Sequence, residues 1–349
     1  MQIGSLPIGN RLFHPPLLDV YKYIRENTTE MTPKGTAALG LVLALMGILP
    51  MVIIMKKYFY GANKSGPYCE GWYFKWQAGD GRAFAVIPAF HIRQNGERSA
   101  SIQVITDGQA WYLEYPVIAF DASQGLFCVE IGGNRFSEAG LLLDIEKEGL
   151  SLHGWVEFGA LQRLGSDIMG PFRWLANMEC VHSVISMRHL LQGRLEINDS
   201  LLDFNKGIGY IEADRGSSFP TTYLWTQCLW DNCSMMLSIA TIPLGKLHFT
   251  GCICAIVING REYRLATYRG VKILNWSSKG ASLCQGKYRL EVELLEQKPQ
   301  PLRAPSDGNM IRTTHESLCA RGRYRFWQGK ELSFDHTDDS ASFEYAQKP

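Results

Sequence analysis

The sequence predicts an all-β protein made of two lipocalin-like antiparallel halves, each a β-barrel or a sandwich. Short apolar stretches recur along most of the chain and are separated by turn residues, a spacing typical of β-barrels and sandwiches. Asp-Gly or Asn-Gly pairs end at Gly81, Gly96 and Gly108, and such pairs favour hairpins because their turns need positive φ. No sustained helical periodicity is present after residue 60, so a helical fold is not expected.

A hydrophobic helix is expected before the β halves. Residues 1–36 carry no motif and form an N-terminal extension, whereas residues 37–55 are an uninterrupted apolar run. Such a run is long enough to cross a bilayer, so it is a candidate transmembrane helix. The lysine pair at 56–57 weakly favours a cytoplasmic location for the β halves. The alternative is a soluble cytoplasmic protein that begins at Met31 or Met55.

The first β half is predicted over residues 60–195 and the second over residues 196–349. Residues 172–179 are compatible with either a short helix or a loop. Alternating or continuous apolar patterns predict strands at 74–77, 83–88, 100–105, 110–115, 126–131, 141–145, 150–158, 181–187, 195–197, 201–204, 234–241, 252–258, 263–268, 271–276, 287–296, 322–327 and 341–345.

Composition excludes several classes of protein. The formal net charge of the 349 residues is +1, so no nucleic-acid partner is expected. Nine cysteines without a Cys-x-x-Cys pair argue against a disulfide framework or a zinc ribbon and fit a reducing compartment. The chain lacks the nucleophile elbow of α/β-hydrolases, the glycine motif of dinucleotide folds and the His-Glu-x-x-His metal motif. We therefore expect neither a cofactor nor a metal site.

The most informative stretch is residues 205–230. Glu212 and Asp214 stand two apart in a predicted strand, so their carboxylates share one face. An arginine, a glycine and two serines follow, and an aromatic strand begins after Pro220. Carboxylates on one wall and aromatic residues on another suit acid catalysis on an apolar substrate. The alternative is a turn-capping ion pair between Asp214 and Arg215. The aromatic strand places four alternate residues on one face: Thr221, Tyr223, Trp225 and Gln227.

The same stretch resembles the tocopherol cyclase family. That family has Glu-Lys-(Asp/Asn)-Trp-Gly-(Ser/Gly)-(Ser/Ala)-Phe-Pro where this chain has Glu-Ala-Asp-Arg-Gly-Ser-Ser-Phe-Pro. Arg215 stands where the family has tryptophan, which changes the electrostatics of the site. The resemblance runs from about Lys56 to the C-terminus, with three further blocks in the same order: residues 70–75, 168–172 with 178–180, and 302–305.

The resemblance implies a pair of lipocalin-like barrels and a defined reaction. In that reaction a prenylated hydroquinone closes to a chromanol when a proton adds to its alkene, and no redox cofactor is needed. Barrels of this kind hold a small apolar ligand in the interior or the mouth. Asp214 is the first candidate for the acid and Glu212 the second. Should Arg215 pair with Asp214, Glu212 or Glu179 becomes the better acid.

Further residues are candidates for substrate binding, and each has a structural alternative. Tyr223 and Trp225 could stabilise a cation through their ring faces or could simply be core residues. A second function is possible on the same scaffold, a non-catalytic protein that binds an apolar lipid or isoprenoid. The remaining candidates are Glu70 and Trp72 on one strand face, His91, His182 as a partner of Glu179, and Gln227.

Overall fold

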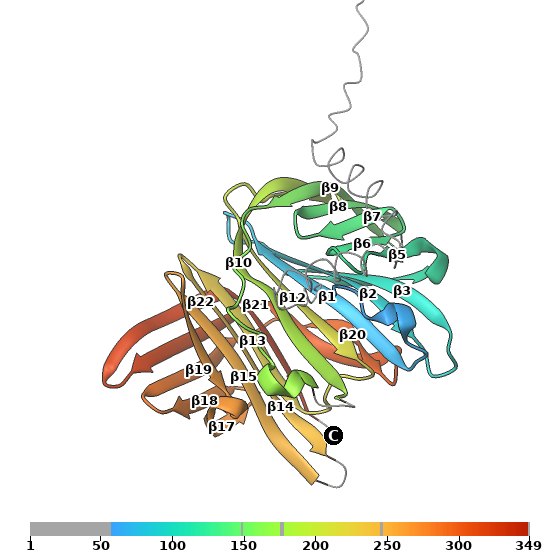
Figure 1. Ribbon diagram of the computed structural model, residues 1–349. Helices are drawn as coiled ribbons and strands as arrows, with labels where there is room; N and C mark the ends of the chain where they lie inside the picture. The colour runs from blue at the N-terminus through green and yellow to red at the C-terminus, as the bar shows by residue number, and fades with distance from the viewer. Residues whose placement is uncertain (1–56, 148, 175–177, 245–246, 348–349) are drawn as a thin grey trace, which may run out of the picture. The chain divides into compact units, whose positions relative to one another are not determined.

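Two large antiparallel β-sheets make up the described part of the chain in a computed structural model (Figure 1). The structure describes residues 57–147, 149–174, 178–244 and 247–347. Within these ranges the helical elements are short 3-10 turns, so the prediction of an all-β protein with two antiparallel sheets is confirmed. The turns are η1 (Gly61–Asn63), η2 (Val117–Ala119), η3 (Gly170–Trp174) and η4 (Thr267–Arg269).

The first sheet contains the strands β1 (Tyr68–Gln77), β2 (Ala83–Ile92), β3 (Arg98–Thr106), β4 (Ala110–Pro116), β5 (Phe120–Ala122), β6 (Cys128–Ile131), β7 (Asn134–Ser137), β8 (Gly140–Lys147), β9 (Leu150–Phe158), β10 (Cys180–Ile197), β11 (Ser200–Asp203) and β12 (Ile208–Gly216). Their order is β4-β3-β2-β1-β12-β10-β9-β8-β7-β6-β5, and β11 pairs with β10. Strand β12 thus lies between β1 and β10 (Figure 1).

The second sheet contains β13 (Tyr223–Trp230), β14 (Cys233–Leu244), β15 (Leu247–Ile258), β16 (Arg261–Ala266), β17 (Lys272–Ser277), β18 (Gly280–Gln285), β19 (Tyr288–Glu296), β20 (Gln300–Ser306), β21 (Asn309–Gln328) and β22 (Glu331–Ala346). The order is β16-β15-β14-β13-β22-β21-β19-β18-β17, and β20 pairs with β21. The predicted hairpin at Asn259-Gly260 joins β15 to β16, with φ values of 48° and 79°.

The chain passes from the first sheet to the second between Gly216 and Tyr223. The predicted boundary between residues 195 and 196 is therefore wrong, and Glu212 and Asp214 belong to the first sheet. Strand β12 returns to the first sheet because both of its edges find partners there, β1 on one side and β10 on the other. Sequence periodicity does not identify these partners, since strand pairing is non-local.

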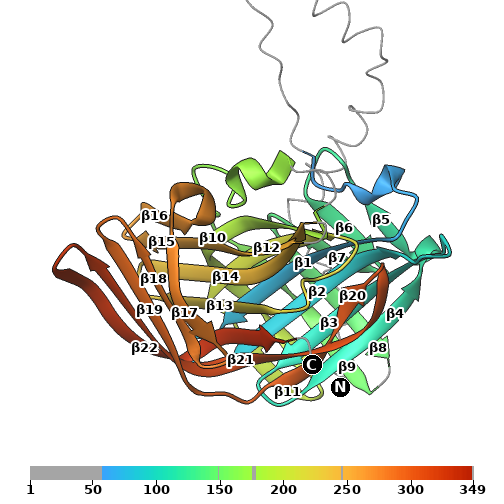
Figure 2. The ribbon, with the colours of Figure 1, turned by 90° about the horizontal axis from the view of Figure 1, so that it is seen from below.

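Three hydrophobic clusters hold the fold together, and strand β1 contributes to two of them. Trp72, Phe74 and Trp76 point into the core of the first sheet. Tyr73 points to the opposite face and meets Trp225 of β13 edge-on, with ring centroids 5.4 Å apart. This third cluster takes residues from strands of both sheets, so the two sheets pack against each other, and Figure 2 shows them side by side. Strand β1 is buried on both faces, including its charged residues Glu70 and Lys75.

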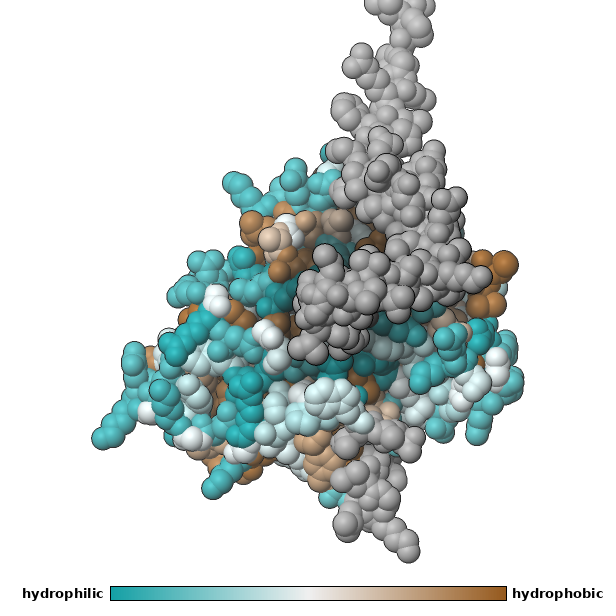
Figure 3. All heavy atoms as spheres, in the orientation of Figure 1, coloured by the Kyte–Doolittle hydropathy of each residue, from teal (hydrophilic) through white to brown (hydrophobic). Residues whose placement is uncertain are grey.

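The face drawn in Figure 3 is mostly hydrophilic where side chains are coloured, with smaller apolar patches. Among the described residues, no helix is long and apolar enough to span a membrane. The extension over residues 1–36 and the candidate transmembrane helix over residues 37–55 lie outside the described residues. Membrane anchoring and a cytoplasmic location therefore stay predictions.

Candidate active site

A cavity of about 190 Å³ lies between the two sheets. Its walls come from β1, β2, β3, β10 and β12 of the first sheet and from β13, β14, β15, β20, β21 and β22 of the second. Apolar side chains line most of it, and each sheet contributes two acidic residues. The resemblance to lipocalin-like barrels implied a ligand in the interior or the mouth of a barrel, but the inside of each curled sheet is filled by its own core. The space for a ligand is where the sheets meet.

Strand alternation places the predicted acidic pair at this cavity. Glu212 and Asp214 both line it, as expected for residues two apart on β12. The Glu212 side chain is only 6% exposed, whereas that of Asp214 is 22% exposed. The two carboxylates therefore share one wall but differ in their contact with solvent.

His182 lies between the two carboxylates. It stands opposite Asp214 in the pairing of β10 with β12. Its Nδ1 is 3.0 Å from Oδ1 of Asp214, and its Nε2 is 3.4 Å from Oε2 of Glu212. Burial disfavours the charged imidazolium, but Asp214 and Glu212 outweigh this effect and raise the pKa of His182 to about 9. The ring is therefore a cation at neutral pH, held by an anion on one side and an acid on the other.

Glu212 is held by two hydrogen-bond donors. The hydroxyl of Tyr210 donates to its Oε2 at 2.6 Å, and Nε1 of Trp225 donates to the same atom at 3.2 Å. Burial raises the pKa of Glu212 to about 7, with Asp214 adding to the effect and His182 opposing it. A carboxyl group with this pKa is partly protonated near neutral pH, which is the form that a general acid needs.

Arg215 does not pair with Asp214 among the described residues. Its guanidinium lies 4.2 Å from the ring centroid of Tyr60 and donates to Oγ of Ser183 at 3.3 Å. The alternative of a turn-capping ion pair between Asp214 and Arg215 is therefore wrong. Asp214 instead accepts hydrogen bonds from His182 and from the thiol of Cys180, at 3.0 and 3.3 Å.

A second pair of buried glutamates at the cavity was missed by the sequence analysis. Tyr73 donates to Glu316 at 2.5 Å, and Tyr223 donates to Glu344 at 2.7 Å. Burial, and then the neighbouring Glu344, raise the pKa of Glu316 to about 8. Glu316 and Glu344 face each other only through the pairing of β21 with β22. No local pattern marks either of them.

Two predicted substrate contacts lie on the wrong face of β1. Glu70 and Trp72 share a face as expected, but that face points into the first core, because it is Cys69, Gly71 and Tyr73 that line the cavity. Glu70 anchors the segment before β1 by accepting hydrogen bonds from backbone N–H groups of residues 60 and 61, at 2.9 and 3.0 Å. Neither residue lines the cavity, and their contribution to substrate binding stays a prediction.

Three further candidates do not line the cavity either. His91 bonds to Ser101 at 2.8 Å, and burial lowers its pKa to about 3, so it is a neutral core residue. The side chain of Glu179 is exposed, and only its backbone carbonyl is used, as acceptor for the N–H groups of residues 217 and 218. Gln227 is fully buried. Glu179, the candidate acid and partner of His182, does not line the cavity, so its catalytic role stays a prediction, whereas Tyr223 and Trp225 do line the cavity.

The group formed by His182, Glu212 and Asp214 can exchange protons or hold a cation. One ligand atom from each residue lies within 4.8 Å of the others. However, Tyr210 and Trp225 both donate to Glu212 Oε2, so the oxygen nearest His182 already has two hydrogen-bond donors. The arrangement is therefore better suited to moving protons than to binding a metal.

Comparisons of the whole fold find similar solved structures, although no protein-family model and no curated protein sequence matches the chain. The crystal structure of CghA aligns with a TM-score of 0.56 at 12% identity, covering 85% of this chain and 94% of CghA. CghA with Sch210972 aligns at 0.52 and 12% identity, over 81% and 89%. Kievitone hydratase from Nectria haematococca aligns at 0.51 and 9% identity, over 85% and 95%. These likenesses show a shared fold.

Proposed function

We propose that this protein is an acid-catalysed enzyme that adds an O–H group to a carbon–carbon double bond of an apolar small molecule. Ring closure of a prenylated hydroquinone is the specific form that the resemblance to tocopherol cyclases implies. The observation that supports the proposal best is His182 held between Glu212 and Asp214 at the wall of an apolar cavity. Such a site offers a proton donor, a proton acceptor and a path between them.

Glu212 is the proton donor in this scheme, in place of Asp214. Its carboxyl group is the more buried of the two, and its pKa of about 7 keeps a protonated fraction at neutral pH. The first step transfers the Glu212 proton to one alkene carbon and leaves a cation on the other. Trp225 and Tyr223 line the same cavity, and aromatic faces stabilise a developing cation.

Asp214 and His182 complete the proton balance. As the oxygen nucleophile bonds to the cationic carbon, its proton passes to the Asp214 carboxylate. The imidazolium of His182 carries a proton on both nitrogens, so it gives its Nε2 proton to the Glu212 carboxylate, 3.4 Å away. The balance closes when Asp214 releases the proton that it took and the neutral ring regains one at Nε2. The acid is regenerated, no electron is gained or lost, and every proton is accounted for.

The source of the oxygen decides the product. A phenol of the substrate itself closes a ring and gives an isomer, whereas a water molecule gives a hydrate. Kievitone hydratase, which shares the fold, is by its name an enzyme that adds water. The same three residues serve both outcomes, so the shape of the cavity selects between them by admitting or excluding water.

The test is turnover in D₂O with the full chain and a panel of prenylated quinols and phenols. We expect a product that carries one deuterium on the former alkene carbon. A product isomeric with the substrate identifies a cyclase, and one heavier by a water molecule identifies a hydratase. Substrates recovered unchanged while bound would contradict the proposal and favour the alternative, a non-catalytic protein that binds an apolar ligand.

Matched variants separate catalysis from folding. Glu212→Gln and Asp214→Asn should each lower kcat by about 10²- to 10⁴-fold, the usual effect of losing a general acid or base. Glu70→Gln is the control, because Glu70 is a buried glutamate of the same sheet that faces away from the cavity. Equal activity losses in all three variants would show that the acidic pair has no specific role.

A further inference from the structure

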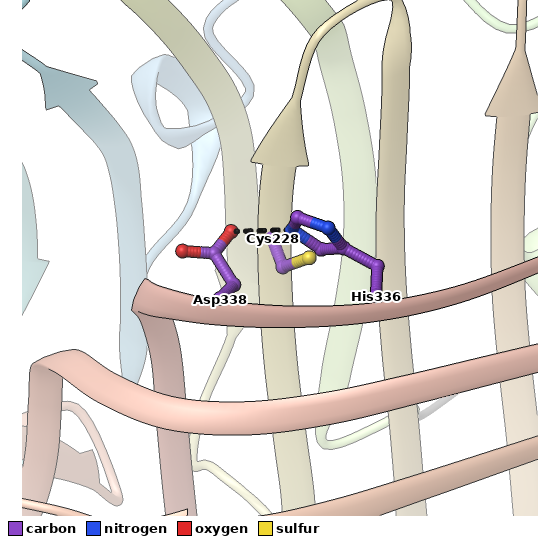
Figure 4. Close-up of side chains that lie close together, drawn as sticks. All are labelled: Cys228, His336 and Asp338. Atoms are coloured by element: carbon purple, nitrogen blue, oxygen red, sulfur yellow. Dashed lines mark ion pairs between the residues drawn. The ribbon is translucent and has the colours of Figure 1, made fainter.

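A second cluster of ligand-type side chains lies in the other sheet, apart from the cavity (Figure 4). It consists of Cys228 on β13 and His336 and Asp338 on β22. One sulfur, nitrogen or oxygen atom from each of the three lies within 4.8 Å of the others. The closest pair of His336 and Asp338, Nε2 and Oδ2, is 3.7 Å apart. None of these residues takes part in the proposed reaction.

The strands fix this geometry. His336 and Asp338 are two apart on β22, so they point to the same face, and Figure 4 shows them converging on Cys228. Trp230 is two residues from Cys228 and stacks on the His336 ring, with centroids 4.4 Å apart and planes 11° from parallel. The stacking restrains the imidazole so that Nε2 is directed toward Asp338.

Two polar atoms of the cluster are buried without a hydrogen-bond partner among the described residues. They are Nε2 of His336 and Oδ2 of Asp338. Asp338 is 8% exposed, so solvent reaches it poorly. Leaving a buried polar atom without a hydrogen-bond partner is unfavourable, and more so when the atom is charged. One metal ion bound between the two residues would give both of these atoms a partner.

We propose that Cys228, His336 and Asp338 bind a zinc ion. Thiolate sulfur, imidazole nitrogen and carboxylate oxygen are the donors that Zn²⁺ prefers in proteins. Tetrahedral zinc with three protein ligands has a fourth position open to water. The separation of 3.7 Å between the His336 and Asp338 atoms is close to that of two ligands on one tetrahedral zinc ion, which lie about 2 Å from the metal.

The ammonium group of Lys75, in the first sheet, would compete with a metal ion for Asp338. It donates to the backbone carbonyl of Ser340 at 2.5 Å and interacts with the charge of Asp338. A zinc ion bound beside Asp338 would be repelled by the charge of Lys75. Replacing Lys75 with methionine should therefore tighten binding.

The test is titration of the chelator-treated full chain with Co²⁺, followed by displacement with Zn²⁺. We expect one equivalent of Co²⁺ to bind with a thiolate charge-transfer band and the intense visible bands of a tetrahedral site. Cys228→Ser should abolish the charge-transfer band. His336→Gln should weaken binding by more than about 100-fold, since changes outside the ligand shell alone cost 10- to 100-fold.

Cys254→Ser is the matched control, because Cys254 is a free, buried cysteine of the same core outside the cluster. It should keep both the band and the stoichiometry. A band that survives in Cys228→Ser, binding that is lost equally in Cys254→Ser, or no stoichiometric binding by either the wild type or Lys75→Met would overturn the proposal. Circular dichroism of every variant confirms that the fold is retained.

Discussion

Replacing Glu316 by glutamine should make the stability of this protein less sensitive to pH. Glu316 is 2% exposed, and its pKa is raised from 4.5 to about 8. The folded state therefore holds a proton that the unfolded state has lost between these two values. Stability from this group is fully present below pH 4.5 and is lost as the pH rises toward 8. Glutamine resembles the protonated side chain in shape and does not titrate.

The size of the effect follows from the shift. One pKa unit corresponds to about 1.4 kcal/mol, so a pKa raised from 4.5 to about 8 amounts to about 5 kcal/mol over the whole range. Roughly 3 kcal/mol of this falls between pH 5 and pH 8. The hydrogen bond from Tyr73 can persist to the amide oxygen, so the two proteins should have similar stability at pH 5.

The assay is urea unfolding of the wild type and Glu316→Gln at several pH values. The free energy of unfolding of the wild type should fall relative to that of the variant as the pH rises from 5 to 8. Glu331→Gln, an exposed glutamate on β22, is the control and should follow the wild type. If the curves of the wild type and Glu316→Gln run parallel over this range, Glu316 is not held protonated and the reasoning is refuted.

Four further predictions concern the site, the core and the surface. In a turnover assay, the rate should fall as the pH rises through about 7, the pKa of Glu212, and a flat profile over that range would exclude Glu212 as the acid. Gly216→Ala should destabilise the protein by more than about 2 kcal/mol, because a Cβ atom would lie 1.9 Å from the carbonyl oxygen of Glu179; a Tm within a degree of the wild type would contradict this. Trp76→Ala removes a fully buried side chain and should cost about 3–5 kcal/mol. Trp174→Ala, at a side chain that is 77% exposed, should change stability by less than about 0.5 kcal/mol.

The sequence was most informative where the decisive pattern is local. Alternating apolar residues and glycine turns predicted the antiparallel strands, and the Asn259-Gly260 turn has the positive φ values that the pattern requires. The spacing of Glu212 and Asp214 placed both carboxylates on one face, and both line the cavity. Strand alternation follows from backbone geometry alone, so neither result depended on knowing the neighbouring strands.

Local patterns could not decide which face of a strand meets which surface. Strand β1 is buried on both faces, so alternation grouped Glu70 with Trp72 but gave no reason to place them in the core instead of the cavity. The sequence likewise could not decide whether Arg215 pairs with Asp214, and in the structure it contacts the ring of Tyr60 instead. In both cases the missing information was the identity of the packing partner.

Tertiary structure alone assembled the complete site. The pairing of β10 with β12 sets His182 opposite Asp214, and the pairing of β21 with β22 sets Glu316 opposite Glu344. These partners are separated by about thirty residues in both pairs and carry no shared local signal. The cavity exists because two curled sheets, each with a filled core, meet face to face. The sequence therefore determined which side chains lie together along one strand, while strand register and sheet packing decided which of them meet across strands, because those contacts depend on residues far apart in the chain.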